Sequence, residues 1–245
     1  MKHICCWSGG KDSTASIILA HENNEPLDII VFVEVMFDKV HGISGENPLH
    51  MKFIKEVAKP LFESWGYRVL ILHSDLDYLD VFYHRIERPV KHMEHKGMCS
   101  GFPLSKRCSV KRDCKLRPMK KFYKSLNEPY VEYVGICADE PVRLSSLYKD
   151  ANKISLLEKY GYTQGMSREK CEEYGLLSDS YELSRRGGCW FCPNAKDCEL
   201  ALIRREQPRV WQQFLSLEKE PDLAFPKWNV FRDITLKEID ERLAL

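Results

Sequence analysis

The stretch "SGGKDS", residues 8–13, decides the fold of this chain, because it joins a short apolar run to a helical pattern. The preceding "HICCW" (3–7) is too short for a helix and is typical of a buried strand. The following "STASIILA" (13–20) has the apolar spacing of a helix packed on a sheet. A strand, a glycine turn and a helix direct backbone N–H groups toward an anion, so the stretch predicts a phosphate-binding loop.

The residue types of this loop suit a nucleotide phosphate and its magnesium ion. Glycines let the backbone approach a ligand closely, Lys11 adds a positive charge, and Asp12 either caps the helix or holds Mg²⁺. An ordinary capped turn explains neither the double glycine nor the lysine. The motif G-x-x-x-x-G-K-[ST] is excluded, because Cys5 stands where its first glycine belongs. The predicted nucleotide-binding residues of the loop are Ser8, Gly9, Gly10, Lys11, Asp12 and Ser13.

The rest of the chain predicts an α/β protein with a Rossmann-like parallel sheet and a mostly helical C-terminal region. Further strands are expected at 27–35, 67–74 and 130–139, and further helices at 48–66, 115–126, 167–175, 195–220 with a break at Pro208, and 235–245. We expect a nucleotide-binding domain at 1–150, with a basic insert at about 76–124, and a helical region at 151–245. Ligands of such sheets bind at the carboxyl ends of strands.

The composition of the chain indicates the cellular compartment in which the protein is expected. No apolar run reaches 18 residues, which predicts no membrane span and no membrane partner. The expected strand at the N-terminus leaves no room for a signal peptide, so a cytoplasmic location is expected. The ten cysteines therefore need an explanation other than disulfides.

A cysteine cluster near the C-terminus has metal-ligand spacing. "GGCWFCPNAKDC" places Cys189, Cys192 and Cys198 as C-x2-C-x5-C, a pattern typical of a metal–thiolate knuckle. A fourth ligand is expected upstream, from Cys108 or Cys114, with Cys99 as a further option. Sulfur-only ligation suits Zn²⁺ or an iron–sulfur cluster, and the spacing does not separate them. A redox pair at the CxxC is the alternative.

Charge is unevenly distributed along the chain. The segment 85–124 holds 13 Lys or Arg residues against three acids, while the net charge of the whole chain is +1. The remainder therefore carries −9. This basic segment is either a solvated surface or a rim for a polyanion, which would be a nucleotide or a nucleic acid.

Four motifs together resemble the PAPS reductase family, within the PP-loop adenine nucleotide α-hydrolase superfamily, over roughly residues 3–200. They are the loop at 8–13, "CSVKRDCKLRP" (108–118), "GICADEPVR" (135–143) and "GLLSDSY…GGCWFCP" (175–193). The third is similar to G-I-R-x-D-E-S-x-x-R, which lines the family's nucleotide pocket. The resemblance implies that Asp139 and Glu140 bind the nucleotide, and that Arg143 acts in catalysis with Lys11 and Asp12. Cys137 stands where the family often has arginine.

The knuckle resembles that of DndC-like members, which implies a [4Fe-4S] cluster. The family pattern C-x-x-x-R-D-x-K-x-x-P implies that Cys108 is the fourth ligand. Assimilatory PAPS reductases carry a nucleophilic cysteine in a C-terminal tail, and this chain has no cysteine after Cys198.

The activity implied by the resemblance is binding of ATP and cleavage between its α- and β-phosphates, which activates a substrate for sulfur transfer. A sulfonucleotide (PAPS or APS) reductase is one alternative. A non-catalytic nucleotide-binding module with structural Zn²⁺ is the other. The acceptor, the sulfur donor and any reductant are not indicated by the sequence.

Overall fold

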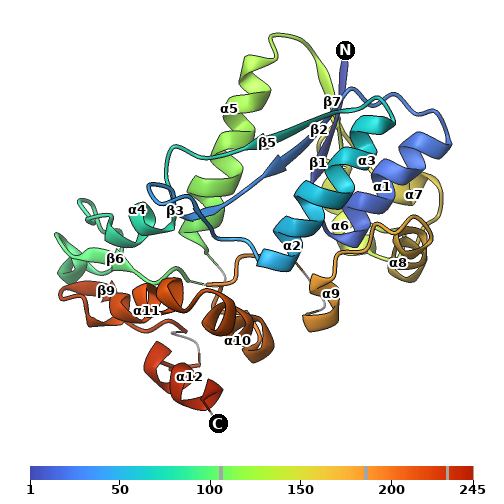
Figure 1. The fold of residues 1–245 in the computed structure, drawn as a ribbon. Helices are drawn as coiled ribbons and strands as arrows, with labels where there is room; N and C mark the ends of the chain where they lie inside the picture. Colours follow the sequence, from blue (N-terminus) through green and yellow to red (C-terminus); the bar gives the residue numbers. More distant parts are fainter. Residues whose placement is uncertain (105–106, 185–186, 230–231, 245) are drawn as a thin grey trace. The chain divides into compact units, whose positions relative to one another are not determined.

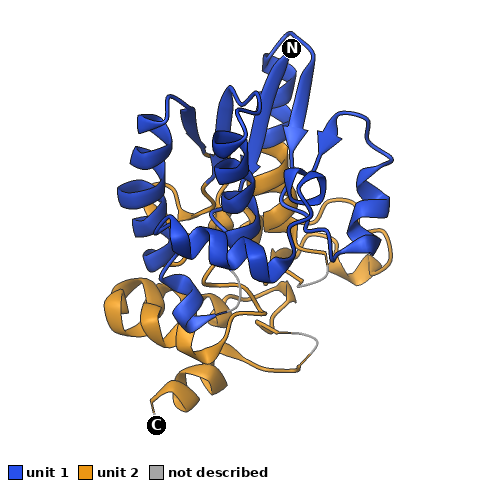
Figure 2. Cartoon of the chain, turned by 90° about the vertical axis from the view of Figure 1, so that its right-hand side faces the viewer, with its two compact units in different colours: residues 1–33, 48–72, 119–187 blue, residues 34–47, 73–118, 188–245 orange. Residues whose placement is uncertain are grey.

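The computed structural model describes residues 1–104, 107–184, 187–229 and 232–244. Figure 1 shows the fold coloured along the sequence, and Figure 2 colours the two compact units that share the chain: residues 1–33, 48–72 and 119–187 form the first, and residues 34–47, 73–118 and 188–245 form the second. The expected domain boundary at residue 150 lies inside the first unit. The strand β8 (Lys153–Ile154) and the helix α8 (Gln164–Glu173) come after residue 150, and they belong to the sheet and to its cover. Within the described residues, no helix combines the length and apolar character that crossing a membrane requires.

The first unit contains a five-stranded parallel sheet in the order β5-β2-β1-β7-β8, which confirms the predicted fold class. The strands are β1 (Lys2–Trp7), β2 (Ile29–Val33), β5 (Arg68–Leu72), β7 (Tyr130–Tyr133) and β8 (Lys153–Ile154). The fourth predicted strand, 130–139, is wrong beyond Tyr133. Beyond Tyr133 the chain is no longer in the sheet, and Gly135 passes against the backbone of Asp12 and Ser13.

Side chains that alternate along the central strand build two apolar layers. Cys5 and Trp7 of β1 pack on one face against α1 (Lys11–Glu22), whereas Ile4 and Cys6 face the layer under α5 (Arg117–Ser125). The first face is also covered by the helical elements α2 (Pro48–Lys52), η1 (Phe53–Ala58), α3 (Lys59–Ser64), α7 (Leu156–Lys159) and α8 (Gln164–Glu173). The short helices α6 (Pro141–Leu147) and α9 (Ser180–Leu183) complete the unit.

Two π-helical segments end beside a proline, one inside the predicted helix 48–66 and one that overlaps only the start of the predicted helix 115–126. In the predicted helix 48–66, η1 closes with a bond from Lys59 N to Ile54 O, immediately before Pro60. In the second unit, η3 (Lys111–Leu116) ends in the same way with Arg117 N bonded to Arg112 O, before Pro118. Proline has no N–H to continue the regular ladder, so the preceding amide bonds one residue further back.

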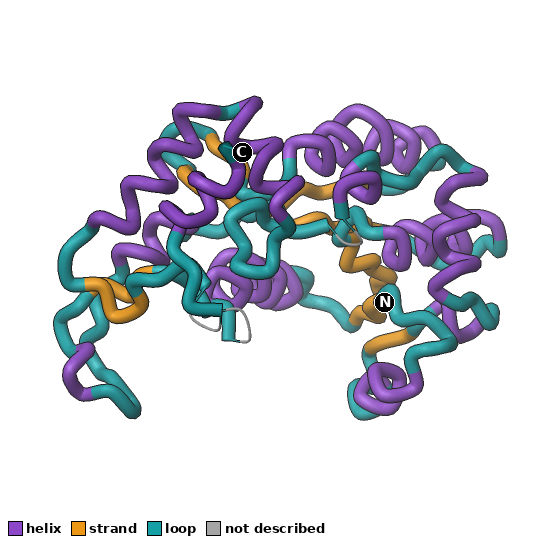
Figure 3. The backbone as a smooth tube through the Cα atoms, turned by 90° about the horizontal axis from the view of Figure 1, so that it is seen from below, coloured by secondary structure: helices purple, strands orange, loops and turns teal. Residues whose placement is uncertain are grey.

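The second unit consists mostly of helices and loops, which Figure 3 colours along the backbone. Many of the side chains in its core are aromatic. Its helical elements are α4 (Tyr78–Tyr83), η2 (Met93–His95), η3, α10 (Asp197–Glu206), α11 (Pro208–Ser216), η4 (Leu217–Lys219) and α12 (Leu236–Leu243). Its strands are β3 (Met36–Asp38), β4 (Ile43–Ser44), β6 (Cys99–Gly101) and β9 (Leu223–Phe225). The break at Pro208 is confirmed, as is the capping box of Thr235 and Glu238 that begins α12.

Candidate nucleotide site and cysteine knuckle

The loop at 8–13 connects β1 to α1 in a conformation that its glycines permit. Gly9 has a φ of +73°, and a Cβ there would lie 2.5 Å from the His50 ring and from Ile54 Cδ1. Ser8 N donates to Ser13 Oγ at 3.1 Å, and the two serine hydroxyls are 3.0 Å apart. The serines therefore close the loop on itself, and glycine is required at position 9.

The N-terminus of α1 keeps backbone amides outside the helical ladder. Thr14 N makes the first helical bond, to Gly10 O at 3.0 Å, so the amides of Lys11, Asp12 and Ser13 precede it. Lys11 N instead donates to Tyr181 Oη at 2.9 Å. Lys11 Nζ and Asp12 Oδ1 form an ion pair. The loop thus combines helix amides, a cation and a carboxylate, which is what a phosphate with its Mg²⁺ requires.

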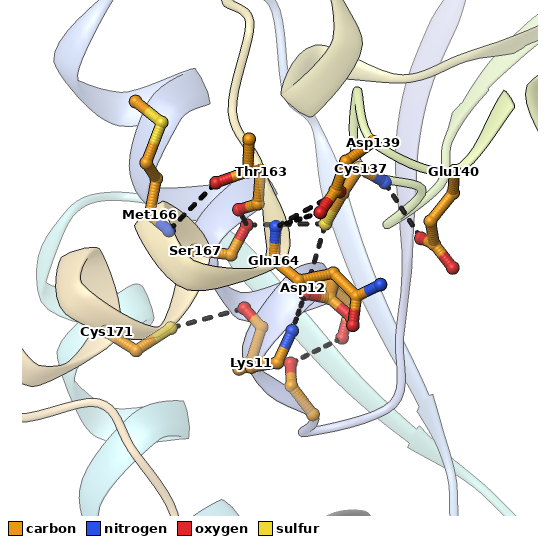
Figure 4. Close-up of polar contacts among 12 residues, drawn as sticks. Lys11, Asp12, Cys137, Asp139, Glu140, Thr163, Gln164, Met166, Ser167 and Cys171 are labelled. Atoms are coloured by element: carbon orange, nitrogen blue, oxygen red, sulfur yellow. Dashed lines mark hydrogen bonds and ion pairs between the residues drawn. The ribbon is translucent and has the colours of Figure 1, made fainter.

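The segment after β7 meets this loop at Gly135 and Cys137. A Cβ on Gly135 would lie 2.6 Å from Ser13 N, so only glycine allows this approach. Burial, and to a lesser extent the Asp12 carboxylate, raises the pKa of the Cys137 thiol to about 12. The protonated thiol is 3.3 Å from Asp12 Oδ1, to which it donates, and lies between Asp12 and Ser167 (Figure 4). Cys137 therefore orients Asp12, the predicted magnesium ligand. In the family that the sequence resembles, arginine is often found at position 137.

The predicted residues Asp139, Glu140 and Arg143 are held by partners within the same unit. Asp139 accepts from Gln164 N at 3.2 Å, where α8 begins (Figure 4). Glu140 accepts from Cys137 N at 3.0 Å and from Arg143 Nη1 at 2.7 Å. Although burial opposes them, these hydrogen bonds lower the pKa of the Glu140 carboxyl. Among these three residues, Arg143 lines the cavity beside the loop and is largely exposed, whereas Asp139 and Glu140 do not line that cavity.

A cavity of about 280 Å³ lies beside the loop. Ser8, Gly10, Asp12 and Ser13 line it on the loop side, and Arg143 lines it from α6. Its sheet side includes Cys6 and Glu132. The structure therefore brings Ser8, Asp12 and Ser13 to one cavity with Arg143. Lys11, the other predicted loop residue with a side chain, does not line this cavity.

Sequence reasoning missed two residues that support the loop. His50 is 1% exposed, and its Nε2 donates to the Ser8 carbonyl at 3.0 Å while its Nδ1 lies 3.1 Å from Ser178 Oγ. Burial raises the pKa of the Tyr181 phenol, whose oxygen accepts from Lys11 N. Tyr181 lies in the "GLLSDSY" motif, but nothing in the sequence indicates that Tyr181 contacts Lys11 or that His50 contacts Ser8.

The second unit brings three of the four predicted knuckle cysteines near one another. Burial raises the pKa of the Cys108 and Cys189 thiols, and the nearby Cys192 sulfur adds to this effect at both. Cys192 N bonds to Cys189 O at 3.1 Å in the turn between them. Cys108 Sγ accepts from Lys111 N at 3.3 Å, an interaction typical of thiolate ligands. Cys198 lies at the start of α10 and is exposed.

Cys114, the alternative fourth ligand, faces the core instead. Its side chain is fully buried, and its thiol donates to Asp77 O at 3.5 Å. Burial, followed by the Asp113 and Asp77 carboxylates, raises its pKa to about 12. Burial also raises the pKa of the Cys108 and Cys189 thiols, so it is the hydrogen bond to Asp77 O, and not its pKa, that distinguishes Cys114 from them.

A separate group of potential metal ligands lies in the basic segment. His92, Glu94 and His95 each offer one ligand atom, and these atoms all lie within 4.8 Å of one another. None of the three is a knuckle cysteine.

Part of the positive charge in the basic segment 85–124 is already paired. Arg112 forms a two-point ion pair with Asp113, and Arg85 donates to Gly97 O at 2.7 Å. A second cavity of about 280 Å³ is lined by Arg107, Cys108 and Lys111 among others. Lys106 lies outside the described residues. Cationic side chains thus adjoin the knuckle cysteine of this segment.

Known proteins resemble this chain in structure and not in sequence. No protein-family model matches the chain, and no curated protein sequence matches it. Among solved structures, it is similar to the U34-tRNA thiolase NcsA from Methanococcus maripaludis with its [4Fe-4S] cluster, at a TM-score of 0.44 and 14% identity. The alignment covers 100% of this chain and 72% of that one.

Proposed function

We propose that the chain is a PP-loop enzyme that binds ATP at residues 8–13 and cleaves the bond between its α- and β-phosphates to activate a substrate for sulfur transfer. The observation that carries the proposal is the closed loop between β1 and α1, with glycine required at position 9 and helix amides beside a cavity. A substrate oxygen attacks the α-phosphorus, and pyrophosphate departs with the electron pair of the broken P–O bond.

The chain's own residues account for the stabilisation that this step needs. Lys11 and the helix amides neutralise the charge that develops on the departing pyrophosphate. Asp12 offers carboxylate oxygens to Mg²⁺, and its side chain lines the cavity. Arg143, on the cavity's other wall, is placed to contact the α-phosphate or the acceptor.

Cys108, Cys189, Cys192 and Cys198 are the residues proposed to hold the [4Fe-4S] cluster. The hydrogen bond from Lys111 N to Cys108 Sγ, and that from the Cys114 thiol to Asp77 O, support the choice of Cys108 over Cys114. Four cysteines would ligate all four irons, so the cluster would supply electron transfer, and holding sulfur at an iron would require one of the four cysteines to leave it.

Binding of ATP tests the proposed site. Lys11→Ala and Asp12→Ala should weaken Mg²⁺–ATP binding by about 10- to 100-fold, because each removes a charged contact to the phosphates or to their ion. Calorimetric titration measures the affinity, and thermal melting checks folding. Lys159→Ala is the control, since that lysine is exposed and pairs with Glu25 away from the loop. Unchanged ATP affinity in both loop variants would refute the site.

A further inference from the structure

Two histidines and a glutamate lie close together in the loop before β6. The potential ligand atoms of His92, Glu94 and His95 all lie within 4.8 Å of one another, and His92 Nδ1 is 3.0 Å from Glu94 Oε1. Nitrogen and oxygen ligands arranged tetrahedrally around one Zn²⁺ lie about 3.3 Å apart, because each is about 2 Å from the ion. The three atoms therefore need to approach by at most about 1.5 Å to share one ion.

The backbone holds the two imidazoles on one side of this loop. The helical turn η2 begins after His92, and His95 N donates to His92 O at 3.0 Å. Residues three apart in a 3₁₀ turn eclipse each other. The two rings accordingly stack, with their centroids 5.0 Å apart and their planes tilted by 23°. The spacing of "HMEH" (92–95) thus places two ring nitrogens beside one carboxylate.

Contacts at the base of the loop and behind one ring restrict its movement. Gly97 N donates to Ile86 O at 2.8 Å, and Ile86 N donates to Met98 O at 2.9 Å, so the two ends of the loop are joined. The His95 ring packs edge-on against Phe225 of β9 at 5.5 Å, and β9 pairs with β6 in the same unit (Figure 1). A loop held in this way loses less entropy when a ligand binds.

The donor set indicates the class of ion. Two imidazoles and one carboxylate are typical ligands of Zn²⁺ and similar transition-metal ions, whereas Mg²⁺ and Ca²⁺ prefer oxygen ligands. The side chains of His92 and Glu94 are 62% and 68% exposed, so an ion can reach them from solvent. Lys91 and Lys96 flank the group and repel a cation. The attraction must therefore come from the three ligands and not from the charge of the segment.

We propose that His92, Glu94 and His95 bind one divalent transition-metal ion of the Zn²⁺ class. None of these residues belongs to the knuckle or to the nucleotide loop, so the inference does not depend on the proposed function. Three protein ligands leave at least one coordination position of Zn²⁺ for water or for a further ligand.

The test titrates Zn²⁺ into the anaerobically purified protein by calorimetry, in the presence of excess Mg²⁺. The wild type should show a binding event that the double variant His92→Ala, His95→Ala lacks. Both proteins keep the knuckle cysteines, so zinc that enters the knuckle is common to both titrations. Glu94→Gln should weaken the event at least about tenfold, because it replaces the charged ligand with a neutral one.

The control is His84→Ala, which removes an exposed histidine of the same segment that is not in the ligand group. It should bind Zn²⁺ as the wild type does. NMR of the histidine ring nitrogens identifies the ligands directly: the signals of His92 and His95 should shift when Zn²⁺ is added, and that of His84 should not. Thermal melting without zinc should be alike in all variants, because none replaces a buried side chain.

Identical zinc titrations of the wild type and the double variant would overturn the inference. Unchanged affinity in Glu94→Gln, or an equal loss of affinity in His84→Ala, would also overturn the three-residue site. Competition by Mg²⁺ at equal concentration would contradict the proposed class of ion.

Discussion

Steric limits and hydrogen bonds at single residues fix the geometry of the loop. Gly9 and Gly135 are required because a Cβ at either would meet atoms closer than 3.0 Å. Cys137 donates to Asp12, and His50 donates to the Ser8 carbonyl, so the loop is held from two sides before any ligand binds. A site organised in this way loses less entropy when a phosphate enters.

Glu132 also gives a pH-dependent prediction for stability. Burial raises the pKa of its carboxyl, against the opposing effects of Lys153 and Tyr123. The folded protein therefore holds this proton more tightly than the unfolded chain, and the carboxylate destabilises the fold as pH rises from the unfolded pKa through the folded one. Glu132→Gln removes this cost, so it should melt at a higher temperature than wild type at pH 7.

The measurement is the difference in melting temperature between the two proteins from pH 4 to pH 8. The advantage of the variant should be small at pH 4, grow as pH rises through the folded pKa, and then level off. Each kcal/mol corresponds to roughly 2–4 °C for a chain of this size. A difference in melting temperature that stays constant with pH, or that favours the variant most at pH 4, would show that ionisation of Glu132 does not destabilise the folded protein.

At the scale of elements, the knuckle gives a prediction about metal. Cys108→Ser should lose bound metal and lower the melting temperature, because ligation contributes folding free energy. Cys114→Ser should keep the metal, because its thiol already donates to Asp77 O in the core. Iron, sulfide and zinc analysis of anaerobically purified protein, with its visible absorption spectrum, measures the outcome.

The control for this experiment is the double variant His92→Ala, His95→Ala, which removes the other group of potential ligands. It should keep the iron content of the wild type. Loss of metal in Cys114→Ser with retention in Cys108→Ser would reverse the assignment. Zinc without iron or sulfide would contradict the cluster.

The order of the main strands and helices could be predicted from the sequence, whereas their ends were predicted less well. Apolar runs and glycine turns were enough to predict β1, α1, β2 and β5. The two-residue strand β8 was missed, since so short a run has no measurable periodicity. The π-helical turns before Pro60 and Pro118 were missed because their apolar spacing is close to that of an α-helix.

The candidate site could be predicted only where its residues are neighbours in sequence. Lys11, Asp12 and the loop serines form one motif, so they were found. His50, Glu132 and Tyr181 come from other elements, and only the folded chain brings them to the loop. The interleaving of the two units was also missed, because segments such as 34–47 join a unit through packing with distant residues.

For the whole molecule, the basic segment leads to a prediction about the acceptor. The remainder of the chain carries −9, and Arg112 is already paired with Asp113, so we expect a small acceptor and not a long polyanion. Affinity for tRNA and for duplex DNA should be weak and should change little between two salt concentrations. Tight binding that falls steeply with salt would show many phosphate contacts and contradict this expectation.

The account rests on cleavage of ATP between the α- and β-phosphates, and the products of ATP turnover reveal the bond that breaks. Anaerobically purified protein would be incubated with Mg²⁺–ATP and candidate acceptors, and the phosphorus species identified by ³¹P NMR. We predict AMP or an adenylylated acceptor together with pyrophosphate, and a loss of at least about 100-fold in rate in Lys11→Ala. Formation of ADP and inorganic phosphate, or pyrophosphate release that is unchanged in Lys11→Ala, would contradict the account.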